Sequence, residues 1–151
     1  MTRLYRCTRD IYKYDLTGQG AYLYGGRWNN KGTRLVYTAS NASLAMLELL
    51  VHIRPVLPSV EYVMITLECT SDSVFELKPE DLPANWFQNP APGTCRLLGD
   101  RFIIKNEFLL FKLPSSIIRQ EHNYLINPHH KDFEKVKVIS IEPIQFDTRL
   151  F

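Results

Sequence analysis

Glu48 and Arg27 are the two side chains whose type and surroundings most suggest chemistry. Glu48 lies in an apolar stretch, since between Ala42 and Val51 the only other polar residue is Ser43. On a helix most neighbours of Glu48 would be apolar, and a carboxylate there is costly unless it is paired, neutralised or open to a cleft. Glu48 is therefore a candidate catalytic or substrate-binding acid. The structural alternative is an ion pair with one of three arginines, Arg27, Arg34 or Arg54.

Arg27 lies in residues 18–32, a segment punctuated by glycines. Glycine permits positive φ angles and lets a ligand approach the backbone closely. The segment also carries Tyr24, Trp28 and Asn29, so it combines a cation suited to phosphate with two rings and an amide. Its spacing matches neither the P-loop nor the dinucleotide-binding fingerprint. We predict a ligand-binding loop here, and a hairpin whose aromatic residues fill the core is the alternative.

The elements that must position these residues are mostly strands. Hydrophobic patterns predict strands at residues 4–7, 34–39, 60–69, 74–77, 108–113, 121–128 and 136–141, helices at 42–51 and 94–106, and a loop at 79–92. Ser40 or Asn41 would cap the first helix, and Pro55 and Pro58 would end it. Because strands and helices do not alternate regularly, we expect an α+β fold with a single compact domain over residues 1–151.

Composition excludes several classes of protein. A chain of 151 residues with 45% hydrophobic residues can bury a real core, and a net charge of +2 gives no reason to expect a polyanion as the main partner. Three cysteines, Cys7, Cys69 and Cys95, are odd in number and widely spaced, which argues against a disulfide framework. The histidine spacing does not indicate a metal site, and we expect none. With no signal peptide or membrane-spanning run, the expected location is the cytoplasm.

The chain also resembles the RES-domain family, which is named for an arginine, a glutamate and a serine. Short motifs carry the resemblance in the family's order, and they cover nearly the whole chain: residues 4–6, 25–29, 36–39 leading to 47–48, 113–115, 121–129 and 146–150. One departure is Arg101 after Gly99-Asp100, where the family tends to have Trp. This difference affects packing and gives no reason to expect different chemistry.

The resemblance implies a fold similar to that of ADP-ribosyltransferases, with a split mixed β-sheet and few helices. It implies the toxin of a bacterial type II toxin–antitoxin pair that degrades NAD+ by cleaving the nicotinamide–ribose bond. NAD+ would be the substrate rather than a cofactor, with water as acceptor or phosphate as a candidate co-substrate. The implied partner is a helical Xre-type antitoxin, through which nucleic acid would be contacted only indirectly, and a homo-oligomer could form within that complex.

The resemblance also assigns candidate site residues. Four would be catalytic, Arg27, Tyr37, Glu48 and Ser115, and five would bind substrate, Arg6, Tyr24, Trp28, Asn29 and Asn123. Glu48 would face the developing ribosyl cation, Arg27 would bind phosphate, and the tyrosines would stack on nicotinamide. Taken singly, four of these have structural alternatives: Tyr37 as core, Ser115 as a turn residue, Asn123 bound to its own backbone, and Arg6 paired with Asp147.

Three other functions remain open at this point. The chain could transfer ADP-ribose to one protein target, since that reaction cleaves the same bond. An RNA-binding or ribonuclease module would need clustered basic residues with exposed aromatics, whereas the basic residues here are spread along the chain. A catalytically inactive interaction module is the third, and the presence of Arg27, Tyr37, Glu48 and Ser115 together speaks against it.

Overall fold

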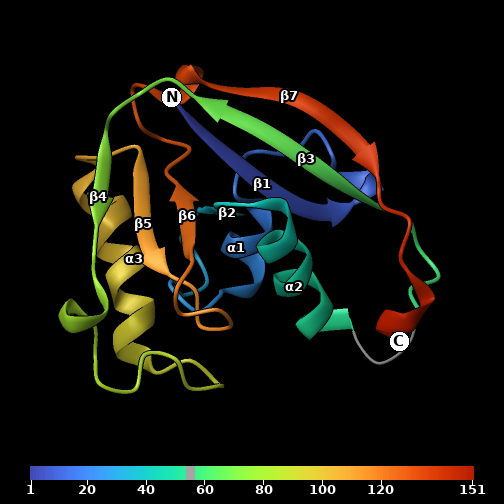
Figure 1. The fold of residues 1–151 in the computed structure, drawn as a ribbon. Coiled ribbons are helices and arrows are strands. Elements are labelled where there is room, and N and C mark those ends of the chain that lie inside the picture. Colours follow the sequence, from blue (N-terminus) through green and yellow to red (C-terminus); the bar gives the residue numbers. More distant parts are fainter. Residues whose placement is uncertain (54–56) are drawn as a thin grey trace.

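The computed structural model of the chain describes residues 1–53 and 57–151. Within these residues, seven strands form one mixed sheet in the order β4-β5-β6-β2-β1-β3-β7, accompanied by three α-helices (Figure 1). The strands are β1 (Thr2–Arg9), β2 (Val36–Ala39), β3 (Tyr62–Cys69), β4 (Val74–Glu76), β5 (Leu110–Pro114), β6 (His122–Ile126) and β7 (Val136–Pro143). The helices are α1 (Gln19–Tyr24), α2 (Ala42–Ile53) and α3 (Gly93–Lys105). The α+β fold expected from the sequence is confirmed.

The helix that carries Glu48 begins where the sequence predicts. Asn41 caps α2, because its Oδ1 accepts a hydrogen bond of 2.8 Å from the backbone N–H of Leu44. The buried side chains of this helix include Leu44, Ala45 and Leu50. The predicted stop at Pro55, like the candidate ion-pair partner Arg54, lies outside the described residues. No helix in the described part of the chain is long and apolar enough to cross a membrane.

The prediction that residues 18–32 form only a loop is wrong at its start. Residues Gln19–Tyr24 form the short helix α1. Gly18 and Gly25 flank it with φ angles of 75° and 71°, in the region that favours glycine. The glycines that suggested an irregular loop are therefore the residues that let the chain enter and leave this helical turn.

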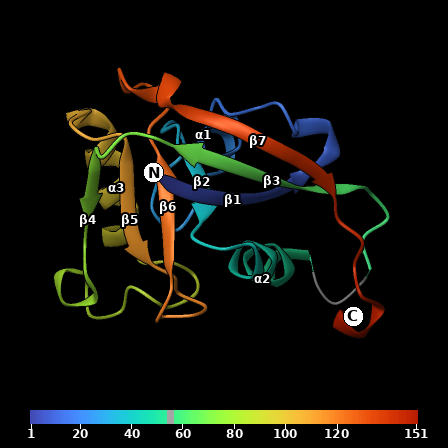
Figure 2. The same cartoon turned by 45° about the horizontal axis from the view of Figure 1, so that its top comes forward.

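The sheet splits between β1 and β2. β1 pairs with β3 along its whole length, but it meets β2 at one register pair, Tyr5 with Ala39. In Figures 1 and 2 the strands β1, β3 and β7 run across the direction of β4, β5 and β6. Arg6 of β1 reaches over the split, since its Nη1 donates to the carbonyl of Tyr37 at 3.2 Å. The divergence opens space beside β2, and α2 packs against β1 and β2 next to it.

Helix α3 packs tightly against the segment that carries Arg27. An added Cβ on Gly99 would overlap the carbonyl oxygen of Trp28. Trp28 itself is buried and stacks on Trp86, with ring centroids 6.3 Å apart. Gly99 is thus required by the close approach of helix and loop.

We expect Gly99→Ala to lower the free energy of unfolding by about 3 kcal/mol, because the contact is with backbone that cannot move aside. Urea denaturation would measure the loss. Gly20→Ala is the matched control, since nothing lies within 4 Å of an added Cβ there. That control is expected to gain about 0.5 kcal/mol in its helix. Equal stabilities of the two variants would contradict the packing described here.

Candidate active site

A cleft of about 1210 Å³ lies at the split in the sheet. It is lined by residues of β1, α1, β2, α2 and β6, by Arg96 of α3, and by the segments 25–31, 87–91 and 116–117. Eight of the nine predicted site residues line it: Arg6, Tyr24, Arg27, Trp28, Asn29, Tyr37, Glu48 and Asn123. The ninth, Ser115, is fully buried and is not among the residues that line the cleft. The fold thus brings together residues that are far apart in the sequence.

Ser115 fixes the Glu48 carboxylate. Its Oγ donates to Glu48 Oε1 at 3.0 Å and accepts hydrogen bonds from the backbone N–H groups of Ile117 and Ile118. These two amides orient the hydroxyl hydrogen toward Glu48, because they occupy the oxygen's acceptor sites. Within residues 1–53 and 57–151, no ion pair involves Glu48. Arg34, one of the candidate partners, instead lies over the ring of Tyr22 at 4.6 Å.

We expect Ser115→Ala to lower activity about tenfold through kcat, because the carboxylate loses the donor that orients it. The variant also leaves two backbone amides without their acceptor, which should lower the free energy of unfolding by about 2 kcal/mol. Both effects can be measured on one preparation, by steady-state kinetics and urea denaturation. Ser43→Ala is the matched control, because Ser43 is exposed on α2, the helix that carries Glu48. Unchanged kcat in the folded Ser115 variant would contradict the positioning role.

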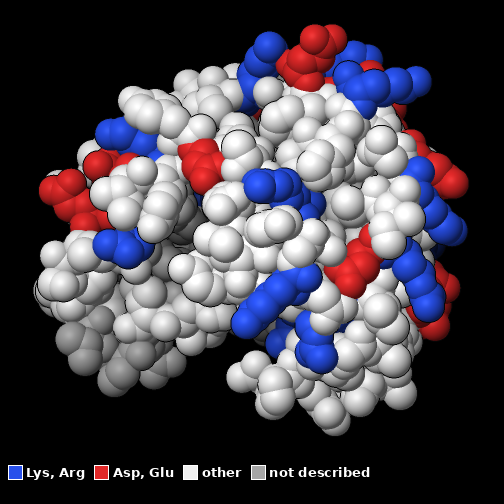
Figure 3. All heavy atoms as spheres, turned by 180° about the vertical axis from the view of Figure 1, so that it is seen from behind, with Lys and Arg blue, Asp and Glu red and all other residues white. Residues whose placement is uncertain are grey.

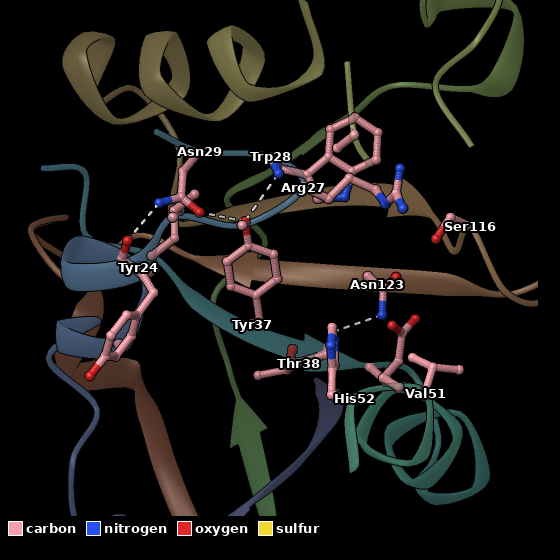
Figure 4. Close-up of a pocket in the computed structure, with 18 of the residues that line it drawn as sticks. Tyr24, Arg27, Trp28, Asn29, Tyr37, Thr38, Val51, His52, Ser116 and Asn123 are labelled. Carbon is pink, nitrogen blue, oxygen red and sulfur yellow. Dashed lines mark hydrogen bonds between the residues drawn. The ribbon is translucent and has the colours of Figure 1, made fainter. Parts of the chain in front are cut away.

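Arg27 spans the opposite side of the cleft. Its Nη1 donates to the carbonyl oxygens of Trp86 at 2.9 Å and Gln88 at 2.6 Å. The guanidinium carries five N–H donors, so these two bonds leave donors for an anion. In Figure 4 Arg27, Ser116 and Asn123 face a common space, with His52 on the α2 side. Arg27 can therefore bind phosphate and hold the segment 86–88 at the same time.

Tyr37 connects the strand β2 to the Arg27 segment (Figure 4). Its hydroxyl donates to Asn29 Oδ1 at 2.5 Å and accepts from the backbone N–H of Trp28 at 3.1 Å. Burial raises the pKa of this phenol, so it stays protonated and keeps donating. Asn29 is fully buried, and its Nδ2 donates to three backbone carbonyls, those of Ala21, Asn30 and Thr33. The hydrogen bonds of Tyr37 and Asn29 thus hold the backbone of the Arg27 segment in its conformation.

Arg6 provides a second cation at the cleft. Its Nη1 is bonded to Tyr37, and its Nε is buried with no hydrogen-bond partner among the described residues. Burial lowers the pKa of this guanidinium, and the negative charge of Asp15 opposes the change. The alternative pairing with Asp147 does not occur, because Asp147 binds Arg149 at 2.7 Å. A buried donor without a partner costs stability, so this nitrogen is a candidate for binding a ligand.

Asn123 and Tyr24 lie at opposite sides of this site. Asn123 extends from β6, and its Nδ2 donates to the carbonyl of Thr38 on the neighbouring strand β2 at 3.3 Å, not to its own backbone. Tyr24 is 78% exposed and points away from Arg27 and Asn123 in Figure 4. Stacking of Tyr24 on nicotinamide remains a prediction, and its exposure does not support it.

The sequence reasoning missed His52, which also lines the cleft. It follows Glu48 by one helical turn, and this spacing was the signal that could have found it. Cys7 lines the cleft too, but burial raises the pKa of its thiol to about 12, although Arg6 partly opposes the change. A thiol with such a pKa is a poor nucleophile at neutral pH. The described residues contain no cluster of three or more His, Cys, Asp or Glu suited to a metal ion.

Comparison with known proteins gives a consistent result. The RES domain family model matches residues 3–147. A protein named Toxin Res from Yersinia enterocolitica is 40% identical over 136 residues, which cover 89% of each chain. A protein named Prs ADP-ribosylating toxin from a Sphingobium species is 31% identical over 155 residues, covering 99% of this chain and 96% of that protein.

One solved structure supports the fold alone. The toxin–antitoxin complex MbcT–MbcA of M. tuberculosis contains a chain similar to this one, with a TM-score of 0.78 and 17% sequence identity. The likeness covers 95% of this chain and 84% of that one.

Proposed function

This chain belongs to the RES domain family, and from that premise we propose that it is the toxin of a bacterial toxin–antitoxin pair that degrades NAD+. The reaction is cleavage of the bond between nicotinamide and ribose, with phosphate or water as acceptor. The observation that carries this proposal is the position of Glu48. Its carboxylate lines a cleft, is held by Ser115, and is free of ion pairs within the described residues.

The chemistry needs a carboxylate at that position. When the bond breaks, its electron pair goes to the nicotinamide nitrogen and positive charge develops on the ribose. A nearby carboxylate stabilises such an oxocarbenium-like transition state, as in glycoside hydrolysis. The acceptor oxygen then forms the new bond to the anomeric carbon, and a water acceptor releases a proton. Glu48 can stabilise the cation and orient the acceptor, since only one of its oxygens is bonded to Ser115.

The two arginines suit the anionic part of NAD+. Arg27 offers its remaining guanidinium donors to the pyrophosphate or to an acceptor phosphate. Arg6 is a second cation lining the same cleft, and its buried Nε has no hydrogen-bond partner among the described residues. Tyr37 keeps the Arg27 segment in place and presents its ring to the cleft. Anion binding would thus be the role of the two arginines, and stabilisation of the ribosyl cation the role of Glu48.

Product analysis tests the proposal. Purified protein is expected to consume NAD+ and release nicotinamide in equal amounts. With phosphate present, ADP-ribose-1″-phosphate identifies phosphorolysis, whereas ADP-ribose in both conditions identifies hydrolysis. No nicotinamide release from folded protein, with or without phosphate, would contradict the proposed reaction.

Modification of a protein target is the second candidate, and the name of the Sphingobium relative favours it. The same bond is cleaved, but a protein side chain replaces phosphate or water. Labelled NAD+ added to a cell extract would then yield labelled protein whose labelling depends on Glu48. Figure 3 gives less support to an RNA target, because Lys and Arg are interspersed with Asp and Glu across the visible face. Salt-dependent retention of RNA would revive that alternative.

An antitoxin is the proposed partner, and its Xre type is taken from the family resemblance. Since this enzyme must be silenced at its substrate site, we propose that the antitoxin covers the cleft holding Arg27 and Glu48. NAD+ consumption by the purified complex should be low and should rise when the antitoxin is removed. Full activity of the intact complex would contradict this mode of inhibition.

A further inference from the structure

Asp100 of α3 makes three hydrogen bonds to the segment that follows Arg27. Its Oδ1 accepts from the backbone N–H of Asn30 at 3.0 Å and from Thr33 Oγ1 at 2.8 Å. Its Oδ2 accepts from Asn30 Nδ2 at 2.6 Å. Burial alone would raise the pKa of Asp100, but the bonds from Asn30 and Thr33 outweigh it, so the pKa is lowered. The carboxylate is therefore ionised when it holds the loop.

Arg96 lies one turn before Asp100 on α3 and binds the same loop residue, Asn30, at its side-chain oxygen. Its Nε donates to Asn30 Oδ1 at 3.2 Å, and its Nη1 donates to the carbonyl of Ala91 at 2.6 Å. Asn30 is thus bound by both side chains, through its backbone N–H and both ends of its amide. Arg96 also joins this loop to the 86–91 segment.

Arg27 makes a second connection between its own loop and the 86–91 segment. It precedes Asn30 by three residues, and its guanidinium binds the carbonyls of Trp86 and Gln88. The Arg27 segment and the 86–91 segment therefore contact each other at Arg27 and are both anchored to α3. The close contact of Gly99 with Trp28 keeps helix and loop in fixed register. These contacts restrain the backbone from which Arg27 extends.

We propose that Arg96 and Asp100, here named the α3 clamp, are positioning residues that hold Arg27 in its binding geometry. The inference rests on the proposed function, because Arg27 is the residue it serves. Asp100 lies outside the cleft lining, whereas Arg96 and Asn30 are among the residues that line the cleft. The clamp acts on Asn30, and Asn30 fixes the backbone from which Arg27 extends. Misplacing a binding group by about 1 Å can reduce activity on the order of 100-fold.

The experiment uses an exchange of two side chains. Asp100→Asn places a donor where Asn30 Nδ2 already donates, so this bond is lost and the two opposed N–H groups push the loop away from α3. Adding Asn30→Asp restores the bond, because the amide now on α3 can donate to the carboxylate now on the loop. The oxygen of that amide still accepts from the loop backbone N–H and from Thr33, and the loop carboxylate keeps an oxygen for Arg96 Nε. All four bonds survive in the double variant, and one reverses its direction.

Asp100→Asn is expected to raise KM for NAD+ about tenfold and to change kcat by less than about threefold, since phosphate binding is affected and Glu48 is not. The double variant should return KM to within about threefold of the parent. Thr33→Val removes the bond from Thr33 Oγ1 to Asp100 and lies outside the cleft lining, so it provides the same KM test if Asp100→Asn does not fold. Parental KM in folded Asp100→Asn or Thr33→Val overturns the proposal. So does a folded double variant that recovers no activity.

Asp72→Asn is the matched control, because Asp72 is exposed and lies outside the cleft lining. Hydrogen exchange separates this inference from the proposed function. The backbone amide of residue 30 should exchange faster in Asp100→Asn and slow again in the double variant, whatever reaction the protein catalyses. If the parent protein consumes no NAD+, the proposed function fails while this readout still tests the clamp. Unchanged exchange of that amide contradicts the clamp alone.

Discussion

Glu48→Gln is expected to lower kcat for NAD+ cleavage about 1000-fold while the protein remains folded. Glutamine keeps the size of the side chain and can still accept the hydrogen bond from Ser115. It removes the negative charge that faces the ribosyl cation, so the loss falls on the transition state and KM should change little. Nicotinamide release under saturating NAD+ measures the effect directly.

A matched control for this variant is Glu134→Gln, at an exposed position outside the cleft. Its kcat should equal that of the parent. Thermal unfolding of Glu48→Gln should show a melting temperature at or slightly above the parental value, because a half-buried charge has been removed. Parental turnover by folded Glu48→Gln would contradict the assignment of Glu48 as the catalytic carboxylate.

Arg27→Ala is expected to lower kcat/KM about 100-fold, mainly through KM. Two losses combine in this variant. The cleft loses a planar donor group for phosphate, and the 86–88 segment loses the bonds from Nη1 to Trp86 and Gln88. Arg27→Lys should recover little of this, because an ammonium cannot hold two carbonyls and bind a phosphate in the same fork geometry.

Arg101→Ala is the control for Arg27, since Arg101 is exposed on α3 and lies outside the cleft lining. Steady-state kinetics with NAD+ as the varied substrate separates KM from kcat. A loss confined to kcat would show that Arg27 acts on the reacting atoms instead of on binding. Full recovery by Arg27→Lys would show that charge alone is needed.

Local patterns predicted the elements well, for physical reasons that are visible in the structure. The alternation of residues 60–69 became β3, in which every second residue is buried. The apolar run after Asn41 became α2, capped by the side chain expected to cap it. Glu48 was singled out because its position conflicts with a purely apolar face, and the cleft explains that conflict. Burial and capping are local in sequence, so a single sequence carries them.

The parts that the sequence did not predict depend on contacts across long separations. Asp100 was noted only beside a departure from the family pattern, yet it holds Asn30, which lies 70 positions away in the chain. Arg27 was expected to bind phosphate, but its bonds to Trp86 and Gln88 could not be foreseen from glycine spacing. Helix α1 was missed because a glycine in a sequence is compatible with either a turn or a helix boundary. The structure shows that Gly18 and Gly25, with their positive φ angles, are helix boundaries.

The unsatisfied Nε of Arg6 has a consequence for how this protein can evolve. The buried Nε has no hydrogen-bond partner among the described residues, and this lowers the stability of the protein without ligand. An apolar side chain of similar volume at that position would often be more stable. On the proposed function, an anion that binds Arg6 offsets that loss. Selection for a sturdier fold and selection for activity therefore pull in opposite directions at this strand, and variants that have lost their activity should drift toward methionine or leucine there.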